Sequence, residues 1–220
     1  MTTTTNKPAT PANNTRQKTE GRRYGFFGAS GCGKTYLMKR LARRFKHIVI
    51  VDPKEEIEIR GYRKARDRMS FLRALSYQMN AAQPIRIIIT GEQTAALADW
   101  FFGWAFYRAR ANILIIVDET QEICPTGTAR NDPDNNLIKL ARLGRSRGIS
   151  LFIASQRINA VDINLRGNLN DYFLFRQGDF SDAQTVKKMI GKDLFTLPAR
   201  HFYHRSETGD LKLYKSANDL

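Results

Sequence analysis

The sequence has few cysteines and no long hydrophobic run. Cys32 and Cys124 are its only cysteines, and they lie far apart in a chain of 220 residues. Two isolated cysteines predict neither a disulfide framework nor a Cys-rich zinc site, and they favour a reducing, intracellular compartment. No run of about 18 apolar residues is present, so we expect no transmembrane segment. The N-terminus also lacks the charged-then-apolar pattern of a secretory signal.

Acidic residues are in short supply relative to basic ones. The chain has 36 Lys and Arg against 21 Asp and Glu, which gives a formal net charge of +15. A charge this large favours a polyanionic partner, either nucleic acid or an acidic membrane face. The alternative is a basic surface that serves only solubility. The length and the 42% hydrophobic content are enough for one ordinary α/β domain.

The segment 1–20 contains almost no apolar side chains and is rich in Thr, Asn, Pro and Ala. It cannot bury enough surface to offset its ordering entropy, so we expect a disordered N-terminal tail and a single domain over 21–220. In that domain, apolar strands alternate with helical patterns, which predicts an α/β fold with a central, mostly parallel sheet flanked by helices. We expect strands at 23–27, 47–51, 84–90, 112–117, 150–154 and 172–175, helices at 34–45, 67–79, 92–110 and 135–143, and a C-terminal hairpin at 201–204 and 211–214.

A glycine-rich turn follows the first expected strand and precedes the first expected helix. Its residues fit the phosphate-loop pattern G-x-x-x-x-G-K-[ST] without a mismatch. Glycines let backbone N–H groups approach phosphate oxygens, and the helix that follows points its positive end at them. We therefore predict an ATP site in which Lys34 contacts the β- and γ-phosphates and the Thr35 hydroxyl ligates Mg²⁺. The predicted phosphate-binding residues are Gly28, Ala29, Ser30, Gly31, Cys32, Gly33, Lys34 and Thr35.

A second acidic site follows the apolar run 113–117. Asp118 and Glu119 stand directly after this expected strand. A carboxylate at such a strand end can hold the Mg²⁺ shell, which is the role predicted for Asp118. Glu119 can accept a proton from an attacking water and is the predicted catalytic base. The alternative is a helix start, where the dipole also favours acidic residues.

A run of arginines and a polar strand end follow further along the chain. If the strand at 150–154 is inserted between the two motif strands, Gln156 lies beside the phosphate loop and can sense the γ-phosphate or hold the lytic water. Arg142, Arg145 and Arg147 fit either an arginine finger that reaches a neighbouring subunit's γ-phosphate or contacts with DNA phosphates. A solvated basic loop is the third alternative. We predict Arg145 as the finger, with Arg142 as the other candidate.

These motifs together resemble the FtsK–HerA superfamily of DNA-pumping ATPases. The matching pieces are GASGCGKT, HIVIVDPKEE with Asp52 at its strand end, IIVDE and LARLGRSRGISLFIASQR, and they span roughly residues 22–176. The last piece is the most specific, because a Gly-Arg-x-Arg-Gly loop before a strand ending in Ser-Gln is unlike kinases. The resemblance implies that Asp52 helps to order the site from outside the ligand shell. It also implies an extra strand between the two nucleotide-motif strands.

The superfamily resemblance further implies a homo-oligomeric ring, usually a hexamer, with ATP at subunit interfaces and DNA in the centre. Because the chain carries no recognisable anchor or extra domain, it looks most like the genome-packaging ATPases of membrane-containing icosahedral viruses. The expected function is ATP-driven packaging of DNA into a preformed capsid, in the host cytoplasm or associated with the virion, with capsid vertex proteins as further partners. The alternatives are a HerA-like cellular or plasmid DNA pump, a small nucleotide or metabolite kinase, and a nucleotide-dependent assembly protein.

Overall fold

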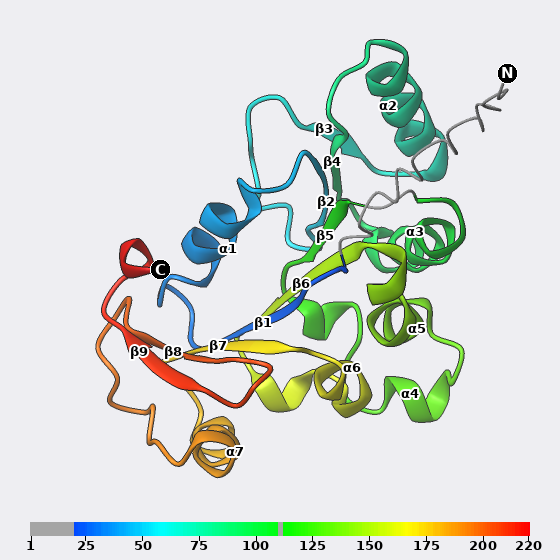
Figure 1. The fold of residues 1–220 in the computed structure, drawn as a ribbon. Coiled ribbons are helices and arrows are strands. Elements are labelled where there is room, and N and C mark those ends of the chain that lie inside the picture. The colour runs from blue at the N-terminus through cyan, green and yellow to red at the C-terminus, as the bar shows by residue number, and fades with distance from the viewer. Residues whose placement is uncertain (1–19, 110–111) are drawn as a thin grey trace, which may run out of the picture.

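A computed structural model describes residues 20–109 and 112–220 (Figure 1). The expected disordered tail lies outside these residues, except for Glu20, and so does Arg110 at the end of one expected helix. Within the described part of the chain, no helix is both long enough and apolar enough to cross a membrane.

Strands and helices alternate along most of the chain. The strands are β1 (Arg23–Phe27), β2 (His47–Val51), β3 (Arg63–Ala65), β4 (Arg86–Ile89), β5 (Ile113–Val117), β6 (Ile149–Ser155), β7 (Asp171–Phe175), β8 (Phe202–Arg205) and β9 (Leu211–Tyr214). The helices are α1 (Lys34–Ala42), α2 (Arg68–Asn80), α3 (Thr94–Arg108), α4 (Thr128–Asn131), α5 (Asn136–Leu143), α6 (Ile163–Gly167) and α7 (Phe180–Ile190).

All of these strands join one sheet, in the order β3-β4-β2-β5-β6-β1-β7-β8-β9. The strands from β3 to β7 in this order are parallel, and β8 and β9 add an antiparallel hairpin at one edge. β6 separates β5 from β1, as the sequence predicted for the strand between the two motif strands. The predicted P-loop fold, with its inserted strand and C-terminal hairpin, is therefore confirmed.

Helices cover the two faces of the sheet unequally (Figure 1). On one face α1 packs Leu37 and Leu41 against strand residues such as Phe26 and Ile116. On the other face the helices α2, α3 and α5 enclose the bigger apolar core, which includes most of the aromatic residues of α3. Both faces of the central parallel strands β2, β4, β5 and β6 are thus largely removed from water, and this explains why these strands are mostly apolar. The edge strand β3 is the exception, because Arg63 and Lys64 are exposed.

Several elements differ from the sequence prediction. α1 ends at Ala42 rather than continuing to residue 45. The short strand β3 and the helices α4, α6 and α7 were not predicted. α7 did carry a readable signal, because Asp179 caps it by accepting hydrogen bonds from the N–H groups of Ser181 and Asp182, and Gly191 ends it in a left-handed conformation.

Candidate functional site

The carboxyl ends of the parallel strands meet at one edge of the sheet. The glycine-rich loop follows β1, Asp118 and Glu119 follow β5, and Gln156 follows β6. These three strands are neighbours in the sheet and end close together. The last residue of β1, Phe27, lies beside Ser155 at the end of β6, and the last residue of β5, Val117, lies beside Ile153, two residues before that end. The fold therefore gathers at one edge the polar groups that the sequence places far apart.

The glycine-rich loop takes a backbone path that other residues would not tolerate. Gly28 has φ +152°, and a Cβ built on it would lie 2.7 Å from the Phe175 Cβ and 2.8 Å from the Arg176 carbonyl oxygen. Gly33 has φ +109° at the position before α1. The Ala29 N–H donates to the Arg176 carbonyl oxygen at 2.8 Å, which ties the loop to the end of β7. The tight, left-handed path is thus set by contact with the neighbouring strand as well as by the turn itself.

Lys34 begins α1 and points its side chain back into the loop. Its Nζ donates to the carbonyl oxygens of Gly28 at 2.6 Å and Ala29 at 3.0 Å. The residue is only 8% exposed, so its charge is held in a poorly solvated position at a helix N-terminus. A buried ammonium together with the first N–H groups of a helix forms a binding place for an anion such as a phosphate group.

Three side chains donate hydrogen bonds to the Glu119 carboxylate. Oε1 accepts from Lys54 Nζ at 2.9 Å and from Gln156 Nε2 at 2.6 Å, and Oε2 accepts from Gln121 Nε2 at 2.6 Å. Burial alone would raise the pKa of Glu119, but the hydrogen bonds from Gln121, Lys54 and Gln156 and the charge of Lys54 outweigh it and lower the pKa. Glu119 is therefore an anion at neutral pH, and its φ of +44° shows that it stands on a strained turn.

Asp118 lies next to Glu119 in a different electrostatic setting. Its Oδ1 accepts the Glu119 N–H at 3.0 Å. Burial raises the pKa of Asp118, and the nearby carboxylates of Glu119 and Asp52 raise it further, against the opposing effects of the Glu119 N–H and the Lys34 charge. A nearby cation would favour the ionised form. The two adjacent carboxyl groups thus have pKa values that are shifted in opposite directions.

Asp52 is buried at the end of β2 and orders the loop that follows. Its Oδ2 accepts the Ile57 N–H at 2.7 Å, and its carbonyl oxygen accepts from the Thr90 hydroxyl at 3.0 Å. This loop carries Lys54, the residue that contacts Glu119. Asp52 therefore does not contact Glu119 itself but holds the backbone of the loop that places Lys54 beside Glu119.

The predicted arginines lie at the opposite edge of the sheet. Arg145 precedes β6, and its guanidinium forms ion pairs with Glu20 and Glu207, each at 2.7 Å. Arg142 is exposed in the last turn of α5. Within one chain, neither residue joins the glycine-rich loop. A role in a neighbouring subunit's site, which is what the sequence suggested, stays a prediction.

Three further polar residues at the site were missed from the sequence. Lys54 and Gln121 contact Glu119, as described above. Gln177 is 1% exposed and donates through Nε2 to the carbonyl oxygens of Phe175 at 2.7 Å and Phe27 at 3.3 Å, which fixes the end of β7 beside β1. A position within three residues of the end of a parallel strand was a signal for Lys54 and Gln177, since Gln156 was selected because it follows β6.

A glycine-rich loop between a buried strand and a helix, with an acidic strand end two strands away, defines a P-loop NTPase. The model of the ATPase family associated with various cellular activities (AAA) matches residues 24–177, and the chain belongs to this family. It therefore binds ATP and is an ATPase. No curated protein matches the chain.

Solved structures of related fold agree with this assignment. The genome packaging NTPase B204 from Sulfolobus turreted icosahedral virus 2, in complex with sulfate, is 15% identical with a TM-score of 0.69, over 90% of this chain and 97% of that one. The N-terminal domain of zonular occludens toxin from Neisseria meningitidis is 15% identical with a TM-score of 0.52, over 91% of this chain and 98% of that one. The cytoplasmic domain of the type VII secretion ATPase EccC from Thermomonospora curvata is 20% identical with a TM-score of 0.53, over 88% of this chain and 25% of that one. The expected resemblance to packaging ATPases is confirmed at the level of the fold.

Proposed function

We propose that this chain is an ATP-driven DNA translocase that packages viral genomic DNA into a preformed capsid. The observation that carries the proposal is the end-to-end match in fold with a protein described as a genome packaging NTPase, which covers 97% of that chain. The net charge of +15 supports a polyanionic partner. The protein works in the host cytoplasm or on the virion, with capsid vertex proteins as further partners.

The residues of the site fit a Mg²⁺ ion, which is the metal that this mechanism needs. Thr35 offers a hydroxyl and Asp118 a carboxylate, and Mg²⁺ prefers such oxygen donors and takes few of them from the protein when phosphates are present. Within the described residues there is no cluster of three or more His, Cys, Asp or Glu side chains that could hold a metal ion. A Mg²⁺ ion held by Thr35 and Asp118 would supply positive charge beside the phosphates.

Three residues of the chain have separate roles in the proposed hydrolysis. Lys34 exchanges the Gly28 and Ala29 carbonyl oxygens for β- and γ-phosphate oxygens. Glu119 accepts a proton from the attacking water, and its lowered pKa keeps it ready to do so at neutral pH. Gln156 Nε2 donates to Glu119 Oε1 at 2.6 Å and so links the base to the end of β6. In this position the Gln156 side chain senses the γ-phosphate.

A ring of identical subunits supplies the remaining part of the site. An arginine of the connection between α5 and β6, Arg145 or Arg142, stabilises transition-state charge on the neighbouring subunit's ATP. Arg145 would have to leave Glu20 and Glu207 to do this, whereas Arg142 is already exposed. A hexamer is the expected ring, with DNA in its centre.

Exposed basic residues near β3 and the start of α2 are the proposed DNA contacts. Lys64 and Arg66 pair with Glu58 and Glu55. Arg63 stacks on the Tyr77 ring at 3.8 Å, which holds its guanidinium at the surface. Contacts of this kind are made with the DNA backbone, so binding is independent of sequence and weakens with salt.

The test is steady-state ATP hydrolysis with and without double-stranded DNA at two salt concentrations. The proposal predicts that DNA raises the rate and that salt removes the increase, with Glu119→Gln as the inactive background. A rate that is indifferent to DNA at both salt concentrations would contradict it. Stimulation by a small acceptor molecule instead of DNA would favour a kinase.

A further inference from the structure

A segment from the C-terminal part of the chain forms a second wall beside the glycine-rich loop. The Arg200 N–H donates to the Cys32 carbonyl oxygen at 3.2 Å. A Cβ built on Gly33 would lie 3.9 Å from the Arg200 Cα, so the two backbones are in contact. The connection between α7 and β8 is therefore fixed against the loop that binds phosphate, although the two are far apart in sequence.

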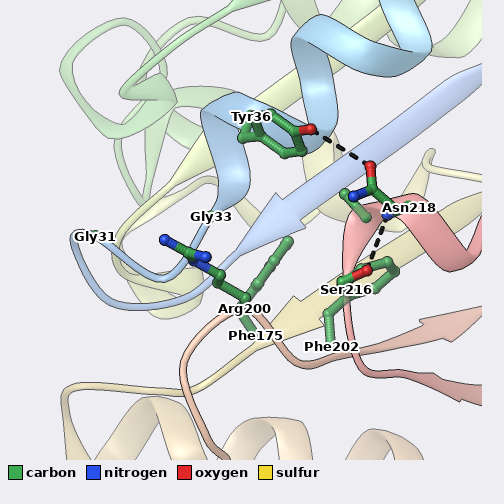
Figure 2. Close-up of a pocket in the computed structure, with 9 residues that line it drawn as sticks. Gly31, Gly33, Tyr36, Phe175, Arg200, Phe202, Ser216 and Asn218 are labelled. Atoms are coloured by element: carbon green, nitrogen blue, oxygen red, sulfur yellow. Dashed lines mark hydrogen bonds between the residues drawn. The ribbon is translucent and has the colours of Figure 1, made fainter.

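A cavity of about 350 Å³ lies between this wall and the loop (Figure 2). That volume is within the range of small-molecule sites. The apolar part of its lining comes from Phe175 and Phe202, whose ring centroids are 5.1 Å apart. Across the cavity the Tyr36 hydroxyl donates to Asn218 Oδ1 at 3.4 Å, and the Asn218 N–H donates to the Ser216 hydroxyl at 3.1 Å. Aromatic walls with a few polar groups suit a nucleoside.

Arg200 stands at the mouth of this cavity in an unusual backbone conformation. Its φ is +66°, in the left-handed region that residues with a side chain seldom adopt. Among the non-glycine residues that the structure describes, Glu119 at the site shares this property, and so do three loop residues, Glu55, Ala82 and Asn112. Such conformations cost free energy and concentrate at functional sites. Here the hydrogen bond to Cys32 holds the backbone in place.

In the ranges that the structure describes, the charge of Arg200 is not neutralised by a carboxylate, which is also true of other arginines such as Arg60 and Arg142. Arg145 and Arg157 each hold two carboxylates. Across residues 20–109 and 112–220, by contrast, Arg200 forms neither an ion pair nor a side-chain hydrogen bond. Figure 2 shows its side chain reaching toward the loop that carries Gly31. A guanidinium placed this way can donate to anionic oxygens at the loop.

We propose that Arg200 binds the phosphate chain of the nucleotide in the chain's own site, with the nucleoside in the cavity beside it. The guanidinium meets the phosphates from the side opposite Asp118 and Glu119. The inference deepens the proposed function, because it rests on the same ATP site, but it does not depend on DNA. One consequence is that a bound nucleotide holds the wall, including residues 216–218, against the loop.

The test measures binding of a fluorescent ADP analogue without DNA. Arg200→Gly removes the guanidinium and suits the left-handed backbone, so it leaves the fold intact. We expect its Kd to rise by about tenfold or more, because hydrogen bonds between charged groups are among the strong ones. Arg200→Lys, which keeps the charge, should fall between Arg200→Gly and the wild type. Lys192→Ala, an exposed charge in the same connection, is the control and should bind like the wild type.

Two readouts separate this role from a structural one. Without nucleotide, the Tm of Arg200→Gly should equal or exceed that of the wild type. Nucleotide should slow hydrogen exchange in residues 198–202 and 216–218 of the wild type, and less so in Arg200→Gly.

A Kd for Arg200→Gly within about twofold of the wild type would overturn the proposal, as would equal weakening by Lys192→Ala. If Arg200→Gly unfolds, the comparison of Arg200→Lys with Arg200→Gln decides, and equal affinities overturn the proposal. Normal ADP binding without stimulation by DNA would instead contradict only the translocase function.

Discussion

The two edges of the parallel sheet both carry charged clusters, but the clusters differ in construction. At the carboxyl edge, three donors converge on Glu119, which is buried and stands on a strained turn. At the amino edge, Arg145 holds Glu20 and Glu207 in ion pairs whose side chains are all at least 40% exposed. Water screens the second cluster and satisfies its groups when they separate. The difference shows that two clusters of charged side chains in one chain can differ in burial and in hydrogen bonding, and it is the buried, convergent cluster at Glu119 that we propose as the catalytic centre.

The largest effect is expected from Lys34→Ala at the carboxyl edge. The variant removes the ammonium that now contacts Gly28 and Ala29. We expect hydrolysis to be lost and nucleotide affinity to fall about 10- to 100-fold, which is the value of a charged hydrogen bond. Lys39→Ala, an exposed lysine of the same helix, is the matched control. If a binding titration gave the two variants equal nucleotide affinity, the buried charge of Lys34 at the carboxyl edge would have no special role in binding.

A large effect on stability is expected from Gly28→Ala. Its Cβ would meet the Phe175 Cβ and the Arg176 carbonyl oxygen below 3 Å, in a backbone conformation that suits glycine. We expect the free energy of unfolding to fall by about 2–4 kcal/mol. Gly31→Ala shares the left-handed backbone but its Cβ would meet no atom within 4 Å, so its loss should be smaller. Thermal or urea unfolding measures both, and equal losses would show that crowding by β7 does not shape the loop.

A moderate effect, visible in pH dependence, is expected from Lys54→Met. Lys54 lowers the pKa of Glu119, so its removal should raise that pKa. A base must be ionised to accept a proton, so the acidic limb of the pH–rate profile should move to higher pH. The lowered pKa also means that Glu119 favours folding above its ordinary pKa, and that this contribution is lost as the pH falls through the folded value. If the acidic limb of the pH–rate profile were the same in Lys54→Met and the wild type, Glu119 would not be the catalytic base.

The smallest effect is expected at the amino edge, from Arg145→Ala. The variant breaks exposed ion pairs, which contribute little to stability. The Tm should fall by at most about 3 °C. A larger fall would mean that the amino-edge cluster is a structural centre. If Arg145 also serves a neighbouring subunit, hydrolysis will fall while the Tm stays near the wild-type value.

The carboxyl edge could be predicted from the sequence because local patterns define it. The phosphate loop has a fixed spacing, and Asp118, Glu119 and Gln156 each follow an apolar strand. The same logic could have separated the arginines: residues that precede a parallel strand lie at the edge opposite those that follow one. Arg145 precedes β6, so its distance from the loop within one chain was implicit in the fold.

The second wall of the site could not be predicted in this way. Arg200 lies in an irregular connection without periodicity, and the contact with Cys32 that places it joins segments far apart in sequence. The residues around Arg200 do not predict its positive φ, because the sequence signal for such a conformation is normally a glycine at that position. The position of Arg200 is set by contacts between segments that are distant in sequence, so it can be seen only in the folded structure.

The most direct measurement of the central claim compares Glu119→Gln with Glu122→Gln for ATP binding and ATP hydrolysis. Glu122 is exposed a few residues along, so the two variants remove the same charge from the same turn. The account predicts that Glu119→Gln lowers the rate of hydrolysis by about 10²- to 10⁴-fold while it still binds ATP, and that Glu122→Gln behaves like the wild type. Hydrolysis by Glu119→Gln at the wild-type rate would contradict the assignment of the carboxyl edge as the catalytic centre.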